Sequence, residues 1–542
     1  MKNNSAFRIF YTFSILFLFG LITFSCTTKN NNVPSIAYVS LESSMLQIED
    51  VVTGLDVPWD IDASRNNELW LTELNGSVYH MDLKSAKQKK VLQLADVLYK
   101  KSYGLLGMAV HPEEPFVFLH YTFTNSPDSL AQQIHSRLVR YTFKNDTLVE
   151  PKILLDNIPG NTYHNGSRIA IAQDNKLFLS LGDTGDSNRA QNDSVITGKI
   201  LRLNLDGTIP EDNPIAGSLI WSRGHRNVQG LAFNKNGMLY GSEHGPNNDD
   251  EINLIEAAGN YGWPDVQGFC DTDQEKKYCS AHTIIEPLTA WTPTIAVAGL
   301  AYYGNHSIKE WQNSLIVANL KGRALRVLKL ADDGRHIIGE HIFFQKKFGR
   351  IRDVSVAANG DIYFATTNRD WHPRFQPWMY DSLPTGPDRI LRLRAMYRNN
   401  EQNPAIAVLQ ENPEPLELLS ENWNPNLEEE FETGGKLYAQ HCLSCHGPNG
   451  QGSEYLIPTL SNTDWVTGDK GRLIRTLLTG LSKPIEINGK MYNQEMPSYA
   501  HLKDQELADI LTYIRNSFNN KAAGVIAGEV YEEREGLKRS SK

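Results

Sequence analysis

Short apolar segments alternate with turn residues from about Leu46 to Ala395, and this range has no long stretch with helical periodicity. One pattern recurs, in which an apolar strand, a turn rich in Asn, Asp and Gly, and a second apolar strand follow one another. Its six copies occupy residues 58–71, 105–119, 168–179, 230–240, 299–317 and 352–364. Asn236-Gly237 and Asn359-Gly360 predict tight hairpins, because both residues of such a turn tolerate positive φ.

Six similar units of this spacing predict an all-β six-bladed β-propeller, since each small sheet can bury its faces only against its neighbours in a ring. A β-sandwich is the competing all-β fold, but six similar units fit it badly. We expect the propeller to span residues 46–396. Residues 397–428 are rich in Pro, Asn and Glu without periodicity, which indicates a linker.

A different pattern follows over residues 429–520 and predicts a small all-α domain. One face of its last helix, for which Asp504 is the expected N-cap, would carry Leu507, Ile510, Leu511, Ile514 and Phe518. Upstream lies the motif Cys442-Leu443-Ser444-Cys445-His446. This spacing is typical of covalently bound haem c, with thioethers to Cys442 and Cys445 and with His446 on the iron. A chance match, or a thiol pair for redox chemistry or zinc, is the alternative.

The second axial ligand of such an iron has two candidates. Met496, in Asn493-Gln494-Glu495-Met496-Pro497, offers a thioether on a rigid turn. Met491 lacks the following proline and ranks second. With these ligands, residues 431–519 resemble class I cytochromes c, which implies a haem that transfers single electrons and has no open position for substrate. The charged residues 521–542 are expected to form a flexible tail.

The N-terminal segment has the pattern of an export signal. Lys2 and Arg8 precede an apolar run from Ile9 to Ile22, which is short for a spanning helix. Residues 1–25 therefore look like a lipoprotein signal peptide, with Cys26 as the acylated N-terminus and 26–45 as a tether; plain secretion is the alternative. We expect a periplasmic or cell-envelope location. In such an oxidising compartment Cys270 and Cys279 are expected to form a disulfide, with two free thiols as the alternative.

Polar residues gather where the apolar strands end. Arg226, Lys321, Arg350 and Arg352 come from three different repeats, and if these ends meet at one mouth of the channel their charge requires an anionic ligand. Taken singly, each is more simply a solvated surface charge. The acidic loop 242–251 offers oxygens suited to Ca²⁺, but it lacks EF-hand spacing and is otherwise an ordinary charged turn. The net charge of −10, with no basic run, argues against a nucleic-acid partner.

These motifs resemble the PQQ-dependent soluble glucose and aldose sugar dehydrogenases, a family of glucose/sorbosone dehydrogenase propellers. The likeness rests on residues 104–112, 164–168, 224–264, Lys321 and 350–353, so it covers essentially the whole propeller. It implies six four-stranded blades with pyrroloquinoline quinone (PQQ), a tricarboxylate, at the top of the channel. It further implies His164 as the general base for the anomeric hydroxyl, and Arg226 as the residue that stabilises charge on the quinone oxygens.

The remaining roles are implied by the same resemblance. Asn227, Lys321, Arg350 and Arg352 would hold PQQ, the carbonyls of Gly245 and Pro246 would bind a Ca²⁺ that polarises it, and Glu251, Tyr261 and Asp271 would bind a second, structural Ca²⁺. Three departures concern the substrate: Tyr163 replaces an acid, His244 replaces a Gln, and Ser102 or Tyr103 replaces a polar cofactor contact. The cofactor cage survives them, so we expect a broader aldose or other polyol-aldehyde substrate.

The two halves together predict a quinohaemoprotein. PQQ would take two electrons from a sugar that is oxidised at C1 to a lactone, and haem c would pass them singly to an external cytochrome or respiratory-chain component. No Gly-x-Gly-x-x-Gly follows a strand, which argues against a nicotinamide or flavin site. The alternatives are a calcium-dependent lactonase and a non-catalytic sugar-binding propeller. The lipid anchor predicts attachment to a membrane, and a homodimer is left open.

Overall fold

The structure is a computed structural model. It describes residues 35–65, 67–100, 102–126, 133–246, 248–370, 383–384, 386–396, 408–409, 427–453, 456–522, 524–525 and 527–540. The expected signal peptide and Cys26 lie outside the described residues, as does most of the expected linker. No helix within the described ranges combines the length and the apolar character that crossing a membrane requires.

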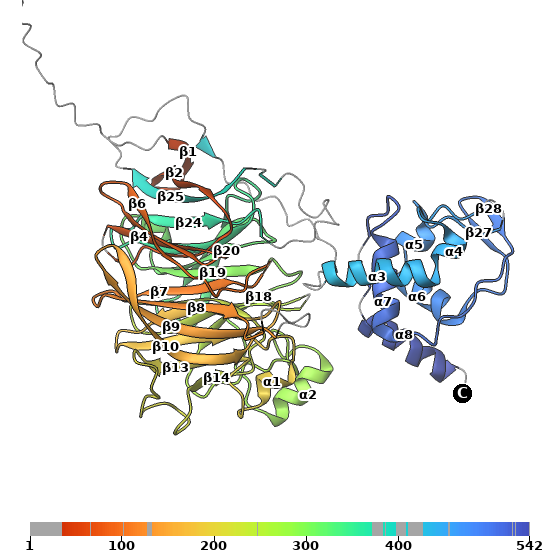
Figure 1. Ribbon diagram of the computed structural model, residues 1–542, viewed down its shortest axis with the longest axis horizontal. Coiled ribbons are helices and arrows are strands. Elements are labelled where there is room, and N and C mark those ends of the chain that lie inside the picture. The colour runs from red at the N-terminus through yellow and green to blue at the C-terminus, as the bar shows by residue number, and fades with distance from the viewer. Residues whose placement is uncertain are drawn as a thin grey trace, which may run out of the picture. The chain divides into compact units, whose positions relative to one another are not determined.

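Six β-sheets form the blades of a propeller (Figure 1). Five of them are four-stranded and antiparallel, with strands in chain order. Their strands are β3 (Pro58–Asp62), β4 (Glu68–Glu73), β5 (Ser77–Asp82) and β6 (Lys87–Gln93); β7 (Leu105–Val110), β8 (Phe116–Phe123), β9 (His135–Lys144) and β10 (Thr147–Pro159); β11 (Ile169–Ile171), β12 (Lys176–Leu181), β13 (Lys199–Asn204) and β14 (Ile220–Arg223); β15 (Val228–Phe233), β16 (Leu239–Glu243), β17 (Asp250–Ile255) and β18 (Thr289–Trp291); and β19 (Val297–Tyr303), β20 (Ser314–Asn319), β21 (Ala324–Leu330) and β22 (Ile337–Phe343).

The sixth sheet joins the two ends of the ring. Its strand order is β23-β24-β25-β2-β1-β26, so strands from both sides of the propeller sequence share one blade. Their bounds are β23 (Ile351–Val356), β24 (Ile362–Thr366), β25 (Asp388–Met396), β2 (Met45–Leu55), β1 (Ser35–Ser40) and β26 (Val408–Leu409). The six predicted repeats coincide with the first two strands of the six sheets, and the predicted propeller fold is confirmed.

Two expected connectors also contribute strands, which corrects the sequence analysis. β1 lies in the expected tether 26–45 and pairs antiparallel with β2, while β26 lies in the expected linker 397–428 and pairs parallel with β1. The reason is burial: Val39 is fully buried and packs in the largest core cluster. A two-residue strand such as β26 carries no periodicity that a sequence pattern could reveal.

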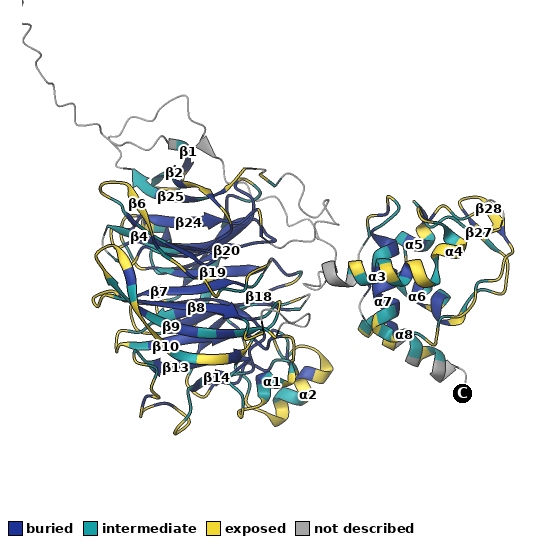
Figure 2. Ribbon diagram, in the orientation of Figure 1, coloured by how far each residue is buried: buried dark blue, intermediate teal, exposed yellow. Residues whose placement is uncertain are grey.

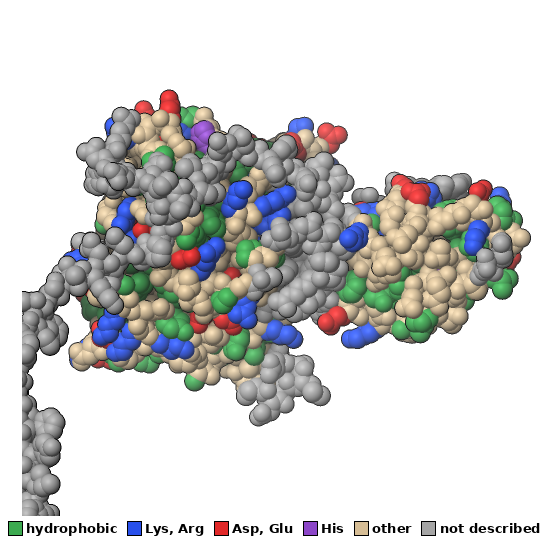
Figure 3. All heavy atoms as spheres, turned by 90° about the horizontal axis from the view of Figure 1, so that it is seen from above, with side chains coloured by type: hydrophobic (Ala, Val, Ile, Leu, Met, Phe, Trp, Pro, Cys, Tyr) green, Lys and Arg blue, Asp and Glu red, His purple; other side chains and the backbone are tan. Residues whose placement is uncertain are grey.

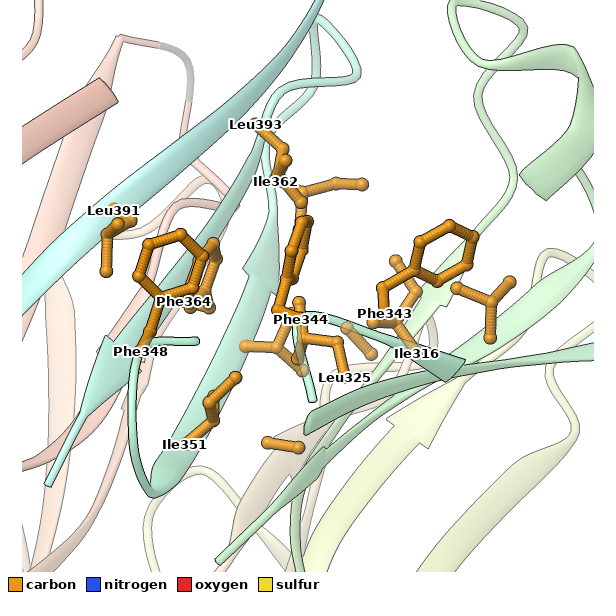
Figure 4. Packing of buried hydrophobic residues seen from close by; sticks show 14 of the residues in the cluster. Ile316, Leu325, Phe343, Phe344, Phe348, Ile351, Ile362, Phe364, Leu391 and Leu393 are labelled. Carbon is orange, nitrogen blue, oxygen red and sulfur yellow. The ribbon is translucent and has the colours of Figure 1, made fainter. Parts of the chain in front are cut away.

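The core lies between and within the blades. Figure 2 shows buried residues along the strands and exposed residues mainly at the turns and outer edges. In the largest cluster, Phe344 and Phe364 stack with ring centroids 5.8 Å apart, and Phe348 packs against both (Figure 4). These aromatic side chains come from β24 and from the loop after β22, so they join the fifth blade to the sixth.

The first strand of every blade lines the central channel. One cavity of this channel is bordered by residues from β3, β7, β11, β15, β19 and β23. The inner strands approach each other closely: a Cβ added at Gly299 would lie 1.9 Å from Oδ1 of Asp353. Arg168 crosses the channel and binds the carboxylates of Asp60 (2.9 Å) and Asp353 (3.0 Å), which belong to the first and sixth blades.

Replacing Arg168 with Met should destabilise the propeller by about 3–5 kcal/mol, because two buried carboxylates would lose their shared counter-ion. Burial already raises the pKa of both Asp60 and Asp353 despite the adjacent guanidinium. The measurement is urea unfolding of the full chain. Arg335→Met is the control, since it removes a solvent-exposed ion pair with Glu256 and should leave the free energy of unfolding almost unchanged. Equal losses in the two variants would contradict this role of Arg168.

The C-terminal domain is helical, as expected. It contains α3 (Leu427–His441), α4 (Leu443–His446), α5 (Asp464–Thr467), α6 (Lys470–Thr479), a hairpin of β27 (Ile485–Ile487) and β28 (Lys490–Tyr492), α7 (Asp504–Arg515) and α8 (Ala527–Ser540). Side chains of α6, α7 and α8 form one apolar core with Tyr438 of α3. The propeller adds the short helices α1 (Asn188–Gln191), α2 (Asp273–Ala281) and η1 (Lys309–Trp311), and the expected Cys270–Cys279 disulfide joins the loop before α2 to the last turn of this helix.

Two expectations for this domain are wrong. Asp504 is the first residue of α7 rather than its N-cap; the N–H of Lys503 donates to the Glu506 carboxylate (2.9 Å), and Asp504 instead binds Arg534 (2.7 Å). The residues expected to be a flexible tail contain α8. Val530 of α8 is fully buried. One face of α8 carries Val530, Arg534 and Leu537 at helical spacing, and Val530 and Leu537 on this face pack in the apolar core of the domain.

Candidate active site

A loop between β10 and β11 carries His164 into the channel. His164 has φ 55°, so its side chain leaves the backbone in a direction that a regular strand does not allow. Its Nδ1 lies 2.8 Å from Oδ1 of Asp183, a residue just after β12. The same carboxylate accepts the indole N–H of Trp263 (2.9 Å) and the backbone N–H of Gly185 (2.8 Å). Three donors therefore hold Asp183, and Asp183 holds the imidazole.

The protonation of this pair follows from its surroundings. Burial alone would raise the pKa of Asp183, but the hydrogen bonds from His164 and Gly185 hold it below its ordinary value. Burial, followed by the charge of Arg226, lowers the pKa of His164. At neutral pH Asp183 is therefore a carboxylate and His164 a neutral imidazole. Because the carboxylate can only accept, the proton of the imidazole sits on Nδ1 and the lone pair on Nε2.

The Nε2 atom of His164 is buried and has no hydrogen-bond partner among the described residues. His164 lines a cavity of about 70 Å³ that opens to solvent. The other residues around this cavity are mainly polar or aromatic: Trp59, Ser102, Leu106, Tyr163, Asn165, Gly166, Arg226, Asn227, Gln229, His244, Ala296, Leu320, Arg350, Arg352 and Asp370. An imidazole with a free lone pair thus lies in the lining of a cavity that opens to solvent.

Three guanidinium groups face the same cavity. Arg226, Arg350 and Arg352 are only 6%, 2% and 4% exposed, whereas in the view of Figure 3 the surface carries side chains of both charges. Asp370 binds both Arg350 (2.9 Å) and Arg352 (2.5 Å). Burial lowers the pKa of Arg352 only to about 10, so it stays charged at neutral pH. The lining therefore holds three cations and one carboxylate, while Asp183, Asp250 and Glu243 act on Arg226 from outside it.

Two of these three guanidinium groups have unused hydrogen-bond donors. Nε of Arg226 and Nε of Arg352 are buried without a partner among the described residues. Arg352 also lies over the ring of Trp59, 3.8 Å from its centroid. Such a set of orphaned cationic donors around a cavity suits a flat ligand with several carboxylates, because the ligand would supply the missing acceptors.

Of the two remaining expected PQQ contacts, one lines the cavity and the other does not. Asn227 lines the cavity, where its Oδ1 accepts the Gly166 N–H (3.2 Å). Lys321 does not line it; the neighbouring Leu320 does. The ammonium of Lys321 is 2% exposed and donates to Thr294 (3.1 Å), and burial lowers its pKa to about 8. The expected convergence of four cations is therefore a convergence of three, with Lys321 outside the lining.

The expected calcium ligands fall into two groups. Gly245, Pro246, Glu251 and Tyr261 line one small cavity together with Glu243 and Asp249. Burial, and then the charge of Glu243, raise the pKa of Glu251 to about 8, so without a cation this carboxyl is mostly protonated at neutral pH; a bound cation would favour its charged form. The described residues contain no group of three or more His, Cys, Asp or Glu side chains close enough to bind a metal.

The ligand set expected for the second Ca²⁺ is not brought together. Asp271 does not line the small cavity that holds Glu251 and Tyr261. The hydroxyl of Tyr261 donates to the Leu254 carbonyl (2.5 Å) and accepts the Glu256 N–H (2.8 Å), which commits it to its own blade. These three residues therefore do not fit a shared metal site in this structure.

In the C-terminal domain, the haem-attachment motif ends at α4. Cys442 and Cys445 are free thiols, and Nδ1 of His446 lies 3.1 Å from the Pro458 carbonyl. That carbonyl fixes the proton on Nδ1 and leaves Nε2 for iron. Met496 packs on the same core as Cys442, whereas Met491 is 51% exposed. These positions fit a haem held by Cys442, Cys445 and His446, and they favour Met496 over Met491.

Four residues of the site were missed by the sequence analysis. Asp183 and Trp263 orient His164, Asp370 neutralises part of the cationic cluster, and Trp59 forms the aromatic wall under Arg352. Asp183 was detectable in principle, because it follows β12 at the end where the other site residues lie. Trp263 and Asp370 were not, since each lies in a loop whose contact with the site appears only in the folded structure.

Both the propeller and the C-terminal domain are similar to known proteins. A family model for glucose/sorbosone dehydrogenase matches residues 55–372, and one for cytochrome c matches residues 431–518. Quinoprotein glucose dehydrogenase B of Acinetobacter calcoaceticus is 29% identical over 435 residues, which cover 64% of this chain and 90% of that protein. Cytochrome c-552 of Thermus thermophilus is 41% identical over 91 residues, 16% of this chain and 69% of that protein. The PQQ-bound aldose sugar dehydrogenase of Streptomyces coelicolor matches with a TM-score of 0.55 and 28% identity, over 65% of this chain and 98% of that chain.

Proposed function

The chain belongs to the glucose/sorbosone dehydrogenase family and carries a C-terminal cytochrome c domain, and from this premise we propose that it oxidises the C1 hydroxyl of an aldose to a lactone. PQQ would occupy the cavity beside His164, and the electrons would pass singly to haem c and then to an external redox partner. The observation that carries this proposal is a neutral imidazole with a free Nε2 beside three buried guanidinium groups.

The lining residues fit PQQ by charge and by donors. The carboxylates of the cofactor would meet Arg226, Arg350 and Arg352, whose charges Asp370 offsets only in part, and Asn227 would add an amide contact. Bound there, PQQ supplies an acceptor for the hydride of C1 and stores two electrons that a haem can take only singly. Trp59 would offer an aromatic wall beside Arg352.

His164 would act as the general base. Its Nε2 would accept the proton of the anomeric hydroxyl, and Asp183 would stabilise the imidazolium that forms. Arg226, which donates to the Gly245 carbonyl (3.0 Å), would place its remaining N–H groups toward oxygens on which negative charge develops. The backbone of Arg226 is itself fixed, because Glu243 accepts its N–H and the N–H of Asn227.

We also propose a Ca²⁺ site in the smaller cavity, which Gly245 and Pro246 line. Carbonyl oxygens of Gly245 and Pro246 would bind Ca²⁺ there, next to the carboxylates of Glu243 and Glu251. A divalent cation would relieve the crowding of these buried acids. We do not carry the Glu251, Tyr261 and Asp271 site forward, because the structure does not assemble it.

The substrate is proposed to be an aldose, with a broader range than glucose. Tyr163 stands before His164, and its ring meets the imidazole edge to face, with centroids 4.9 Å apart. An aromatic side chain at this position packs on the apolar face of a sugar and does not select the hydroxyl pattern that a carboxylate would bind. A panel of aldoses should give turnover with several of them and release the corresponding lactones; a free aldehyde product or strict glucose preference would contradict this substrate class.

The C-terminal domain is proposed to bind haem c through Cys442 and Cys445, with His446 and Met496 on the iron. Covalent haem attachment and the Cys270–Cys279 disulfide both suit an exported protein, which is why we propose a cell-envelope lipoprotein anchored at Cys26. The external acceptor would be a cytochrome or another respiratory-chain component.

Replacing Met496 with Ala should abolish the Met-to-iron absorption band of the oxidised haem and lower its reduction potential, because the thioether ligand favours the reduced state. Met491→Ala, at an exposed position of the same domain, is the matched control and should leave the band unchanged. The measurement is the visible spectrum with a redox titration. Loss of the band in Met491→Ala alone would reverse the assignment.

A further inference from the structure

The segment that follows Met496 is attached to the rest of its domain at several points. The N–H and carbonyl of Met496 both bond to Leu481, at 2.9 Å each. Ser498 donates its hydroxyl to the Leu478 carbonyl (2.6 Å), and the hydroxyl of Tyr499 donates to the His441 carbonyl (2.9 Å), one residue before Cys442. The turn over residues 500–504 then leads into α7, and it is this turn that α8 contacts.

One side chain of α8 makes that contact. The guanidinium of Arg534 donates to the carbonyl of Ala500 (2.6 Å), to the carbonyl of Leu502 (2.8 Å) and to the carboxylate of Asp504 (2.7 Å). A planar guanidinium fixes the relative positions of its three acceptors, which a flexible ammonium cannot do. Arg534 therefore holds the far end of the segment that begins at Met496.

The rest of α8 is anchored elsewhere. Val530 is fully buried in the domain core, Glu529 binds Lys470 (2.9 Å), and Glu533 binds Arg475 (2.7 Å), both on α6. The helix thus spans from α6 to the turn after Met496. Its attachment to α6 and its attachment to the turn use adjacent residues, Glu533 and Arg534, so the two can be separated by mutation.

We infer that α8 is a clamp on the axial-ligand loop, with Arg534 as the positioning residue that keeps Met496 on the haem iron. The inference rests on the proposed role of Met496 as a ligand. If the turn at 500–504 is released, the loop samples more conformations in which Met496 leaves the iron. An added ligand that competes for this position then binds more tightly, because its apparent affinity scales with the fraction of open iron.

The test is imidazole binding to the oxidised haem of the full chain, without PQQ or sugar, together with the reduction potential. Arg534→Gln should bind imidazole about tenfold more tightly than the unaltered protein, since it loses hydrogen bonds of a charged group, and its potential should fall. Glu533→Gln, which removes one of the two ion pairs with α6 and leaves Arg534 in place, should stay within about twofold. Met496→Ala gives the reference for fully open iron.

Each outcome decides the matter. Unchanged imidazole affinity in Arg534→Gln would overturn the inference, and so would equal effects of Arg534→Gln and Glu533→Gln, which would make α8 a general stabiliser. If Arg534→Gln fails to retain haem, Arg534→Lys replaces it: an intermediate affinity supports the clamp, and an unchanged one refutes it. A Met496→Ala variant with unaltered haem spectra would instead refute the ligand assignment on which the inference rests.

Discussion

His164→Ala is expected to lower the rate of aldose-driven haem reduction by about 10²–10⁴, the usual contribution of a positioned general base. The variant removes the only imidazole that combines a free, buried Nε2 with a place in the lining of the cationic cavity, among the described residues. PQQ binding should persist, because the three guanidinium groups are untouched. The measurement is single-turnover haem reduction, with PQQ binding followed separately.

The control for this variant is His341→Ala, on an exposed position of β22 far along the chain from the site. It should reduce haem at the unaltered rate. Full turnover in His164→Ala would remove His164 as the base, whereas loss of PQQ binding in the same variant would show that His164 acts mainly in holding the cofactor.

Asp183→Asn is expected to lower the same rate by about 10³–10⁴, by analogy with other carboxylate and imidazole pairs. The physical reason is a conflict of donors. Asp183 now accepts from His164, Gly185 and Trp263 through its two oxygens. An asparagine has one oxygen, so its NH₂ group must face either the indole N–H or the imidazole Nδ1–H. If the NH₂ group faces the imidazole, relief of the clash moves the imidazole proton to Nε2, where it blocks the base; if it faces the indole, His164 keeps its tautomer but loses the charge of the carboxylate that stabilises its imidazolium form.

The matched control is Asp186→Asn, three residues further on in the same loop. Asp186 is exposed and binds Arg189 (3.2 Å), so its loss should change the rate by less than about twofold. The rate should be followed by stopped-flow measurement of haem reduction with PQQ at saturation. A rate within tenfold of normal in Asp183→Asn would show that the tautomer of His164 is fixed by something else.

The blade count could be predicted from the sequence because the inner two strands of each blade are the most apolar and the most regular. Each predicted repeat begins within a few residues of an observed inner strand, from Pro58 in the first blade to Ile351 in the sixth. Closure of the ring could not be predicted. β26 has only two residues, and the place of β1 in the sixth blade appears only in its pairing with β2 and β26.

The candidate site was predictable to the extent that it depends on strand ends. His164, Arg226 and Arg352 lie at ends that a propeller brings together, so their convergence follows from the fold. Contacts made by the loops do not follow. Trp263 reaches Asp183 across 80 positions of sequence, and Asp370 reaches Arg352 only because β24 ends beside β23. Lys321 differs from these residues, because it is absent from the lining although its neighbour Leu320 is part of it, and its contact with PQQ stays a prediction.

The C-terminal helix α8 illustrates how charge can hide an amphipathic pattern. Its sequence is dominated by Glu, Lys and Arg, which is typical of a solvated tail. Its apolar positions are few, and its remaining contacts are ion pairs with α6 and with the start of α7. Pairing of this kind depends on partners at distant positions, so composition alone predicts disorder where the structure has a packed helix.

The central claim is that the cavity beside His164 delivers electrons from an aldose to the haem of the same chain. The most direct measurement mixes the oxidised, cofactor-free full chain with an aldose in the absence of oxygen, before and after addition of PQQ and Ca²⁺, and follows the absorption of reduced haem. Reduction only after both additions is the predicted result. A haem that stays oxidised in the reconstituted protein, or that is reduced equally without PQQ, would contradict it.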